Sequence, residues 1–349
     1  MDRGTVYLYA PGLLGPIPPQ ARSLVDVRPP HAALLEILGR GKAMNSQVPP
    51  ADPEAGLCVL LGQSGDAEEL PLGELLLLAE GRTAAEDETV FRASPVQLVP
   101  DRDQLLLFGP DSLELSRNEA ADCIQALNQT YVDDGLTFQA HTPHDWSLRV
   151  SGHPRLQTVS LARVAGGPMV DGLPAGEDSR EWIARLNEIQ MLLFSLPVNQ
   201  QRQMNGQATI NGVWIWGGGK LQALEGKAWS RVVGDTPLVA GLARAAGTAW
   251  QPLGRKAEEI PDDGASLVYF DAMPAATDGE RFMAWQRELD AVCSAWLAPL
   301  VRRVQQGRLQ SLVLDAGSGT RWEYRRHHRW RFWRRHGRLA DHLLVREDT

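Results

Sequence analysis

The sequence predicts an α/β protein in which helices cover a mainly parallel sheet. In its C-terminal part, short apolar runs typical of buried strands alternate with longer segments whose apolar residues recur every three or four positions. Such alternation is typical of strand–helix–strand units, which place their strands parallel in one sheet. The chain has 349 residues, 43% of them hydrophobic and 22% charged. That length and composition allow about two globular domains.

The N-terminal part contains one predicted strand and two predicted helices. The strand covers 5–10, where apolar residues alternate with tyrosines, and it runs into a turn rich in proline and glycine at 11–16. Helical composition follows at 31–40 and 72–80. The proline-rich stretch 45–56 between them is expected to be a loop.

The character of the sequence changes near Val90, after an acidic cluster that marks a candidate boundary. Two short strands joined by a polar turn are predicted at 96–98 and 105–108. Ser116 then precedes Glu119 at the spacing of a capping box, which predicts the start of a helix.

Three more elements complete the middle of the chain. Alternation at 146–150 predicts a strand. Apolar residues at steps of four, three and four predict a helix over 181–194, which Pro197 ends. A short strand at 213–216 opens into the glycines 217–219.

The C-terminal part supplies the alternation on which the fold class rests. A helix is predicted to begin after Thr236, which can cap it, with Pro237 in its first turn, and to end at Gly247. A buried strand at 267–270, an amphipathic helix at 282–296 and a strand at 311–314 follow.

Charge and cysteine usage exclude several classes of protein. The net charge of −8 argues against a chain that coats nucleic acid through its overall field. Cys58, Cys123 and Cys293 are too few and too far apart for a disulfide framework or a zinc knuckle. We find neither a membrane-spanning run nor a signal pattern. We therefore expect a cytoplasmic protein with no membrane contact.

A motif runs through 197–199, Arg202, Gly206, Asn211 and 214–220. It resembles a stretch shared by archaeal-type cofactor-independent phosphoglycerate mutases and their bacterial relatives. Further segments at 11–16, 95–96 and 187–191 make the RpfE-type regulatory protein family the nearer resemblance, over nearly the whole chain.

The resemblance implies a domain organisation. An alkaline-phosphatase-like core would combine 1–89 with 212–349, the second part ending in a basic aromatic hairpin. An inserted α+β domain would occupy 90–211. The change of character near Val90 agrees with the first of these boundaries.

The motif also supplies candidate ligand-binding residues. Glycines after a strand let backbone N–H groups approach an anion, and Arg202 offers a planar fork for phosphate or carboxylate. We expect a small phosphorylated or acidic metabolite to contact Asn199, Arg202, Asn211, Trp214, Trp216, Gly217, Gly218, Gly219 and Lys220. The alternative is that the tryptophans are core or interface residues and that the glycines only turn the chain. The segment is not a Walker motif, because such a motif has serine or threonine after its lysine and here Leu221 follows Lys220.

Four further residues are candidates for an outer layer around the ligand: Asn187, Gln190, Asp271 and Asp315. Asn187 and Gln190 lie three apart on a predicted helix, so their amides could project together toward a ligand. They could equally satisfy nearby backbone groups, and this structural role is the preferred interpretation.

The metal ligands of the mutase relatives are mostly missing. Those relatives hold two metal ions through Asp and His clusters and transfer phosphate through a serine. Here the turn after Tyr9 has no carboxylate, Asp315 is followed by Ala316, and Asp271 stands without companions. Two divalent ions need several converging ligands, because each must replace lost water while the ions repel each other. We therefore expect no metal and no cofactor.

The histidines do not change that expectation. His141 and His144 lie near Asp145, but a Thr-Pro turn intervenes and lone histidines are usually structural. His327 and His328 are adjacent, and neighbours on a strand point to opposite faces.

A basic tail ends the chain, with eight arginines between 321 and 338 interleaved with aromatic residues. Arginine beside aromatic rings can hold nucleic acid through phosphate pairing and base stacking. However, Trp322, Tyr324, Trp330 and Phe332 would share one strand face, which favours a closing hairpin with the arginines outside. Nucleic acid is the less favoured partner.

The sequence thus supports one leading function and two alternatives. The leading prediction is a catalytically degenerate mutase-like protein that acts as a regulatory or small-anion-binding protein, with a protein partner as a further expectation. The alternatives are an active phosphotransferase of the same superfamily and a nucleic-acid-associated regulator that uses the basic tail.

Overall fold

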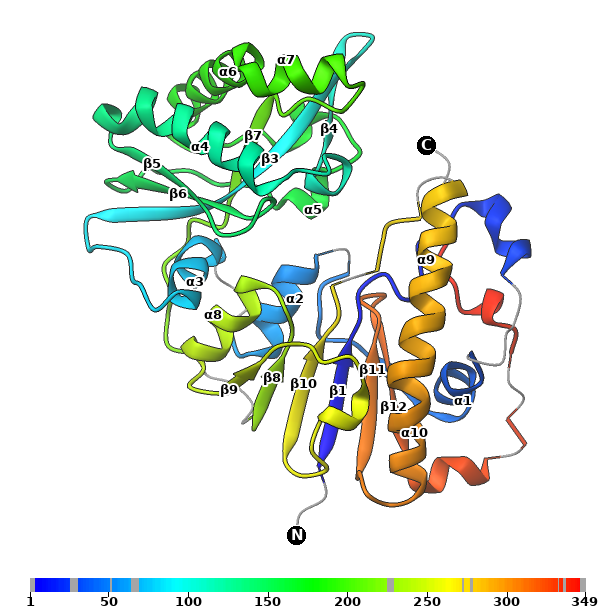
Figure 1. The fold of residues 1–349 in the computed structure, drawn as a ribbon. Helices are drawn as coiled ribbons and strands as arrows, with labels where there is room; N and C mark the ends of the chain where they lie inside the picture. Colours follow the sequence, from blue (N-terminus) through cyan, green and yellow to red (C-terminus); the bar gives the residue numbers. More distant parts are fainter. Residues whose placement is uncertain are drawn as a thin grey trace. The chain divides into compact units, whose positions relative to one another are not determined.

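The computed structural model describes residues 4–25, 31–50, 52–63, 69–224, 229–271, 273–276, 279–331, 333–334 and 337–345. Contacts between Cα atoms divide the chain into two compact units (Figure 1). Unit 1 combines Met1–Gly62 with Leu224–Thr349, and unit 2 is Gln63–Ala223.

Unit 1 is built on a seven-stranded sheet of order β2-β12-β11-β1-β10-β8-β9. Its strands are β1 (Thr5–Tyr9), β2 (Lys42–Asn45), β8 (Arg231–Val233), β9 (Ala249–Gln251), β10 (Ala265–Tyr269), β11 (Ser311–Asp315) and β12 (Thr320–Arg325). β1 pairs in parallel with both β10 and β11, and β8 pairs in parallel with β10 and β9. Only β12 runs in the opposite direction, antiparallel to both of its neighbours, β11 and β2, which confirms the predicted mainly parallel sheet.

Helices pack on the sheet of unit 1. They are α1 (Ala32–Arg40), α2 (Pro53–Leu60), α8 (Pro237–Ala245), α9 (Gly279–Val292) and α10 (Ala298–Gln305), with a π-helical turn at Cys293–Leu297 between the last two. Val6 and Leu8 of β1 belong to the core that also contains the buried residues of α1, α9 and α10. Side chains alternate along a strand, so Tyr7 and Tyr9 point to the other face, where Tyr9 closely approaches Gly56 of α2.

Unit 2 is built on a five-stranded antiparallel sheet of order β4-β3-β6-β5, with β7 pairing β3. Its strands are β3 (Glu88–Asp101), β4 (Gln104–Phe108), β5 (Leu136–Ala140), β6 (Trp146–Ser151) and β7 (Gly212–Trp216). Its helices are α3 (Leu72–Ala79), α4 (Arg117–Tyr131), α5 (Leu161–Val164), α6 (Ser179–Ser195) and α7 (Pro197–Met204). The predicted capping box of Ser116 and Glu119 is present at the start of α4.

Strand pairing explains why the observed division differs from the predicted boundaries at 90 and 211. β7 pairs with β3 from Gly212↔Val96 to Trp216↔Arg92, so 212–216 belongs to the sheet of unit 2. α3 precedes Val90 in sequence but packs on β3, where Gly73 approaches the backbone of Val90 so closely that a side chain would clash. Long-range pairing of this kind leaves no local sequence signal. Unit 2 consequently begins earlier and ends later than the predicted insertion.

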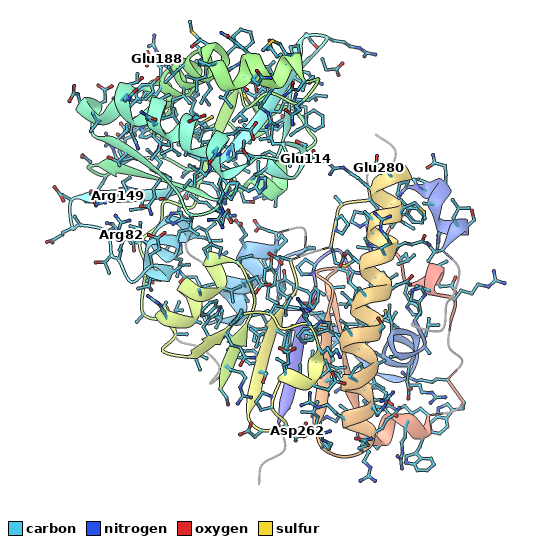
Figure 2. All side chains as sticks on the ribbon, in the orientation of Figure 1. Arg82, Glu114, Arg149, Glu188, Asp262 and Glu280 are labelled. Carbon is cyan, nitrogen blue, oxygen red and sulfur yellow. The ribbon has the colours of Figure 1, made fainter. Side chains whose placement is uncertain are left out.

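Ion pairs connect neighbouring segments in both units. Figure 2 labels Arg149 on β6, whose guanidinium donates to both carboxylate oxygens of Glu88 on β3 at 2.8 and 2.7 Å. These hydrogen bonds hold the pKa of Glu88 below its ordinary value. Figure 2 also labels Asp262 in the loop before β10, which accepts from Arg303 and Arg308 at 2.7 Å each.

The basic tail forms a shorter hairpin than predicted. β11 and β12 pair antiparallel, but the strand ends at Arg325, and a 3-10 helix follows at Arg326–Trp330. Trp330 therefore leaves the strand and is 61% exposed, while Tyr324 is buried. Phe332 lies outside the described residues.

Two arginines of the basic tail donate hydrogen bonds to carbonyl groups at the end of α1. Arg331 donates to the Arg40 carbonyl at 3.0 Å and Arg334 to the Gly41 carbonyl at 3.3 Å. Basic side chains commonly satisfy the unpaired carbonyls at a helix C-terminus, here that of α1.

His327 and His328 lie in the 3-10 helix Arg326–Trp330 and not on a strand as predicted, with ring centroids 4.3 Å apart.

Within the described part of the chain, no helix is both long and apolar enough to cross a bilayer.

We predict that Gly56→Ala destabilises the protein by about 1–2 kcal/mol, although alanine is normally the better helix former. An added Cβ would clash with the Tyr9 hydroxyl and with Val48 Cγ1. Gly279→Ala in α9 is the control, because an added Cβ there meets no atom within 4 Å. Urea denaturation should show a loss at position 56 only, and equal free energies of unfolding for the two variants would contradict the packing argument.

Candidate functional site

Arg202 is buried, with 1% of its surface exposed, and its donors point at protein acceptors. Nε donates to the Ala208 carbonyl at 2.6 Å, Nη1 to Glu119 Oε1 at 2.6 Å, and Nη2 to the Leu113 carbonyl. Although burial raises the pKa of Glu119, hydrogen bonds from Ser116 and Arg202 hold it below its ordinary value. Arg202 thus cross-links α7 to the start of α4. This placement disagrees with its expected role as an anion ligand.

Asn199 and Asn211 also complete backbone hydrogen bonding. Asn199 is fully buried; its Nδ2 donates to the Leu193 and Ile210 carbonyls at 2.7 Å each, and its Oδ1 accepts from the Ile210 N–H at 2.8 Å. Asn211 exchanges two hydrogen bonds with the backbone of Leu98, at 2.7 and 2.9 Å. The Asn211 side chain therefore extends the β7–β3 ladder by one residue. Both asparagines have structural roles.

The glycine turn holds an anion that belongs to the chain itself. The Gly218 N–H donates to Glu69 Oε2 at 3.2 Å, and the Thr158 hydroxyl donates to both carboxylate oxygens at 2.7 and 2.9 Å. The Gly217 and Gly219 N–H groups donate to Thr158 Oγ1 and the Leu70 carbonyl. Burial raises the pKa of Glu69, and the hydrogen bonds offset part of this effect. The three predicted N–H donors are therefore already used inside unit 2.

The remaining residues of the motif pack around the same turn. Trp214 Nε1 donates to the Val159 carbonyl at 2.8 Å, and the guanidinium of Arg92 lies 5.0 Å from the ring centroid of Trp216. Lys220 Nζ donates to the Glu88 carbonyl at 2.8 Å and lies 3.6 Å from Glu74. Trp214 and Trp216 are buried, as the structural alternative predicted.

Asn187 and Gln190 line a cavity on α6, together with Trp214 and residues of β3 and β7. The structure thus brings Asn187, Gln190 and Trp214 together around this cavity. The cavity is separate from the glycine turn at 217–219. Asn187 is exposed and Gln190 is half-buried.

Asp315 lies at the end of β11, where the carboxyl ends of β1 and β10 also lie. Its carboxylate is fully buried and accepts from the Tyr7 hydroxyl at 2.7 Å, the Ser46 hydroxyl at 2.5 Å and the Gly317 N–H at 3.0 Å. Burial, reinforced by the Asp315 charge, raises the pKa of Tyr7 above its ordinary range, so the tyrosine stays a donor at neutral pH. Asp271, after β10, is exposed.

The described residues do not fit a two-metal centre. Among them, no group of three or more His, Cys, Asp or Glu side chains is placed to hold an ion. Asp315 accepts three hydrogen bonds, which use three of the about four lone-pair sites of its carboxylate. His141 is held by Glu80 at 2.7 Å and by Ser147 at 2.9 Å.

Sequence reasoning missed Glu69 and Thr158, which provide the acceptors for the glycine turn. Glu69 lies in a polar stretch that has the pattern of a surface loop, and nothing local marks it as a buried anion. Glu119 was identified as a capping residue, but its ion pair with Arg202 joins residues 83 positions apart.

We predict that Arg202→Met destabilises the protein by about 3–5 kcal/mol, because it leaves Glu119 and two carbonyl groups without their buried partner. Arg185→Met is the matched control: Arg185 pairs with Glu181 one helical turn away at 3.0 Å, and Glu181 is 65% exposed. Its loss should cost about 0.5 kcal/mol or less. Similar losses in urea denaturation would contradict the structural role of Arg202.

The raised pKa of Glu69 predicts a pH dependence of stability. A carboxyl whose pKa is raised above its ordinary 4.5 binds its proton more tightly in the folded state. Its contribution to stability is therefore present below pH 4.5 and is lost as pH rises through the raised value. Glu69→Gln cannot titrate, so its stability relative to the parent protein should increase over that window.

Thermal unfolding of both proteins between about pH 4 and pH 8 measures this difference. Glu86→Gln, which changes an exposed carboxylate, is the control. A constant difference between the parent and Glu69→Gln, or one of the opposite sign, would show that Glu69 does not titrate as proposed.

Comparison with known proteins finds similarity to a curated protein and to solved structures. No family model matches the chain. A probable 2,3-bisphosphoglycerate-independent phosphoglycerate mutase of Geobacter sulfurreducens is 25% identical over 202 residues, which cover 56% of this chain and 50% of that protein. The chain thus spans about half the length of this curated relative.

The solved structures are more distant in sequence. The PH0037 protein of Pyrococcus horikoshii superposes with a TM-score of 0.54 at 14% identity, over 93% of this chain and 87% of that one. A cofactor-independent phosphoglycerate mutase of Thermoplasma acidophilum gives a TM-score of 0.45 at 16% identity, over 93% and 90% of the two chains. The chain is therefore a distant relative of the cofactor-independent phosphoglycerate mutases, with an α/β fold of a mostly parallel sheet and a separate antiparallel sheet.

Proposed function

We propose that this phosphoglycerate-mutase-like protein is a regulatory protein of the RpfE type that has lost catalysis and acts by binding a small molecule. The observation that carries the proposal is the environment of Asp315. In open α/β sheets, ligands bind at the carboxyl ends of the strands. At this edge the Asp315 carboxylate is fully buried and accepts hydrogen bonds from Tyr7, Ser46 and Gly317.

The hydrogen bonds of Asp315 bear directly on catalysis. Two-metal phosphotransfer needs anionic oxygens with free lone pairs, which hold the ions against the attacking and leaving oxygens. The donors around Asp315 use three of its about four lone-pair sites, and the described residues offer no cluster of three ligands. Removing the reacting groups need not abolish ground-state binding, because binding and catalysis use different interactions. Binding without turnover is the function that this arrangement supports best.

The predicted acidic metabolite is not favoured at the glycine turn. An anion there would have to displace Glu69, and Arg202 already has three protein partners. We therefore place ligand binding in another part of unit 2, the cavity lined by Asn187 and Gln190.

The proposal predicts no metal-dependent phosphoglycerate mutase or phosphatase activity. Metal-stripped protein should be supplied in turn with manganese, magnesium, zinc and cobalt, and the interconversion of 2- and 3-phosphoglycerate measured. We expect no turnover above the rate without protein, because the residues at the sheet edge cannot position two ions. An active cofactor-independent mutase assayed in parallel is the control.

Asp315→Asn distinguishes real activity from contamination. Asparagine keeps the size of the side chain and can still accept from Tyr7 or Ser46, but it cannot act as an anionic metal ligand. Metal-dependent turnover that disappears in a folded Asp315→Asn variant would overturn the proposal and favour the enzyme hypothesis.

A further inference from the structure

A cavity of about 250 Å³ lies in unit 2 between α6 and the strands β3 and β7. Eleven residues line it, of which nine are apolar or glycine and two are the amides Asn187 and Gln190. The described lining therefore carries no formal charge. At about 30 Å³ per water molecule, its volume corresponds to about eight waters, which is room for a small organic molecule.

The cavity owes part of its space to Gly212. A Cβ built at Gly212 would come within 3.1 Å of side-chain atoms of both Leu98 and Val96, so a larger residue would crowd this wall. Leu98 is fixed by its two hydrogen bonds with Asn211, and Trp214 by its hydrogen bond to Val159. The wall formed by the strands is consequently held in place before any ligand binds, which reduces the cost of ordering it.

The opposite wall is one face of α6. The helix buries Trp182, Ile189 and Leu193 in the core of unit 2, and this contact fixes its rotation. Ile183, Leu186, Asn187 and Gln190 then line the cavity. They lie at steps of three, one and three along the helix, within one broad face.

The two amides are the polar groups of the cavity lining. Asn187 and Gln190 have no hydrogen-bond partner among the described residues, unlike Asn199 and Asn211, which complete backbone ladders. Each amide offers two donors and an acceptor. A pocket of mostly apolar walls with a few convergent polar groups is typical of small-molecule sites.

We infer that this cavity binds a small neutral molecule with an apolar body and a carboxamide-like group. The apolar body would lie against Leu98, Leu186 and Trp214, and the polar group would exchange hydrogen bonds with Asn187 and Gln190. A charged ligand is disfavoured, because it would lose its hydration without gaining an opposite charge. This inference deepens the proposed function by naming the ligand site of the regulatory protein.

Benzamide is a suitable probe, with benzoate and toluene as matched comparisons. The three share an aromatic ring, but benzoate is charged and toluene lacks a hydrogen-bonding group. Titrations of the full-length protein followed by ¹H–¹⁵N NMR of the tryptophan indole N–H groups should show saturable binding of benzamide. The indole signal of Trp214, assigned with Trp214→Phe, should shift. Benzoate should bind at least about tenfold more weakly, since it carries an unpaired charge into the cavity.

Gln190→Leu removes the amide group and leaves the volume of the side chain nearly unchanged. It should weaken benzamide about two- to tenfold, the loss expected for one neutral hydrogen bond, and leave toluene unchanged. Gln203→Leu on α7 makes the same substitution at an exposed position and is the control. Ile183→Trp, on the half-buried helix face, should fill the cavity and abolish binding of both probes. Thermal unfolding of each variant confirms that it is folded.

Three results would overturn the inference: absence of saturable benzamide binding, benzoate binding as tightly as benzamide, or unchanged benzamide affinity in folded Ile183→Trp. The outcome is distinguishable from failure of the proposed function. Metal-dependent turnover would refute the loss of catalysis whether or not the cavity binds benzamide, and absent benzamide binding would leave the activity assay unaffected.

Discussion

The parallel pairing of β1 with β10 and β11 is the constraint on which the rest of unit 1 depends. Thr5 lies opposite Ala265 on one side and Ser311 on the other, so residues from both ends of the chain form the centre of one sheet. The side chains of β1 alternate between two cores, with Val6 and Leu8 facing the helices α1, α9 and α10. Because β1 is central, the intervening unit 2 is a sequence insertion between α2 and β8.

The same pairing brings Tyr7 and Asp315 together across β1 and β11, although they are 308 positions apart. A buried carboxylate is costly unless hydrogen bonds compensate it, and here three donors do so. Asp315 thus links β11 to β1 through Tyr7.

In unit 2, buried polar groups likewise have partners within the protein. Glu69 occupies the N–H groups of the glycine turn, and Arg202 joins the start of α4 to α7. Both networks are nearly fully satisfied inside the protein, so neither leaves an obvious place for an external anion. The amides of Asn187 and Gln190 differ, because they face a cavity instead of backbone groups. Asn187 and Gln190 therefore keep hydrogen-bonding capacity that a ligand can use.

The sequence by itself determined the class of fold and many of its elements. Strand–helix alternation predicted the parallel sheet, and the spacing of Ser116 and Glu119 predicted the start of α4, because periodicity and capping are local properties. Tertiary structure decided the boundaries of unit 2, the partners of Arg202 and the anion in the glycine turn. Each of these depends on which distant segments pair and which charges become buried together. Neither residue type nor spacing along the chain records that information.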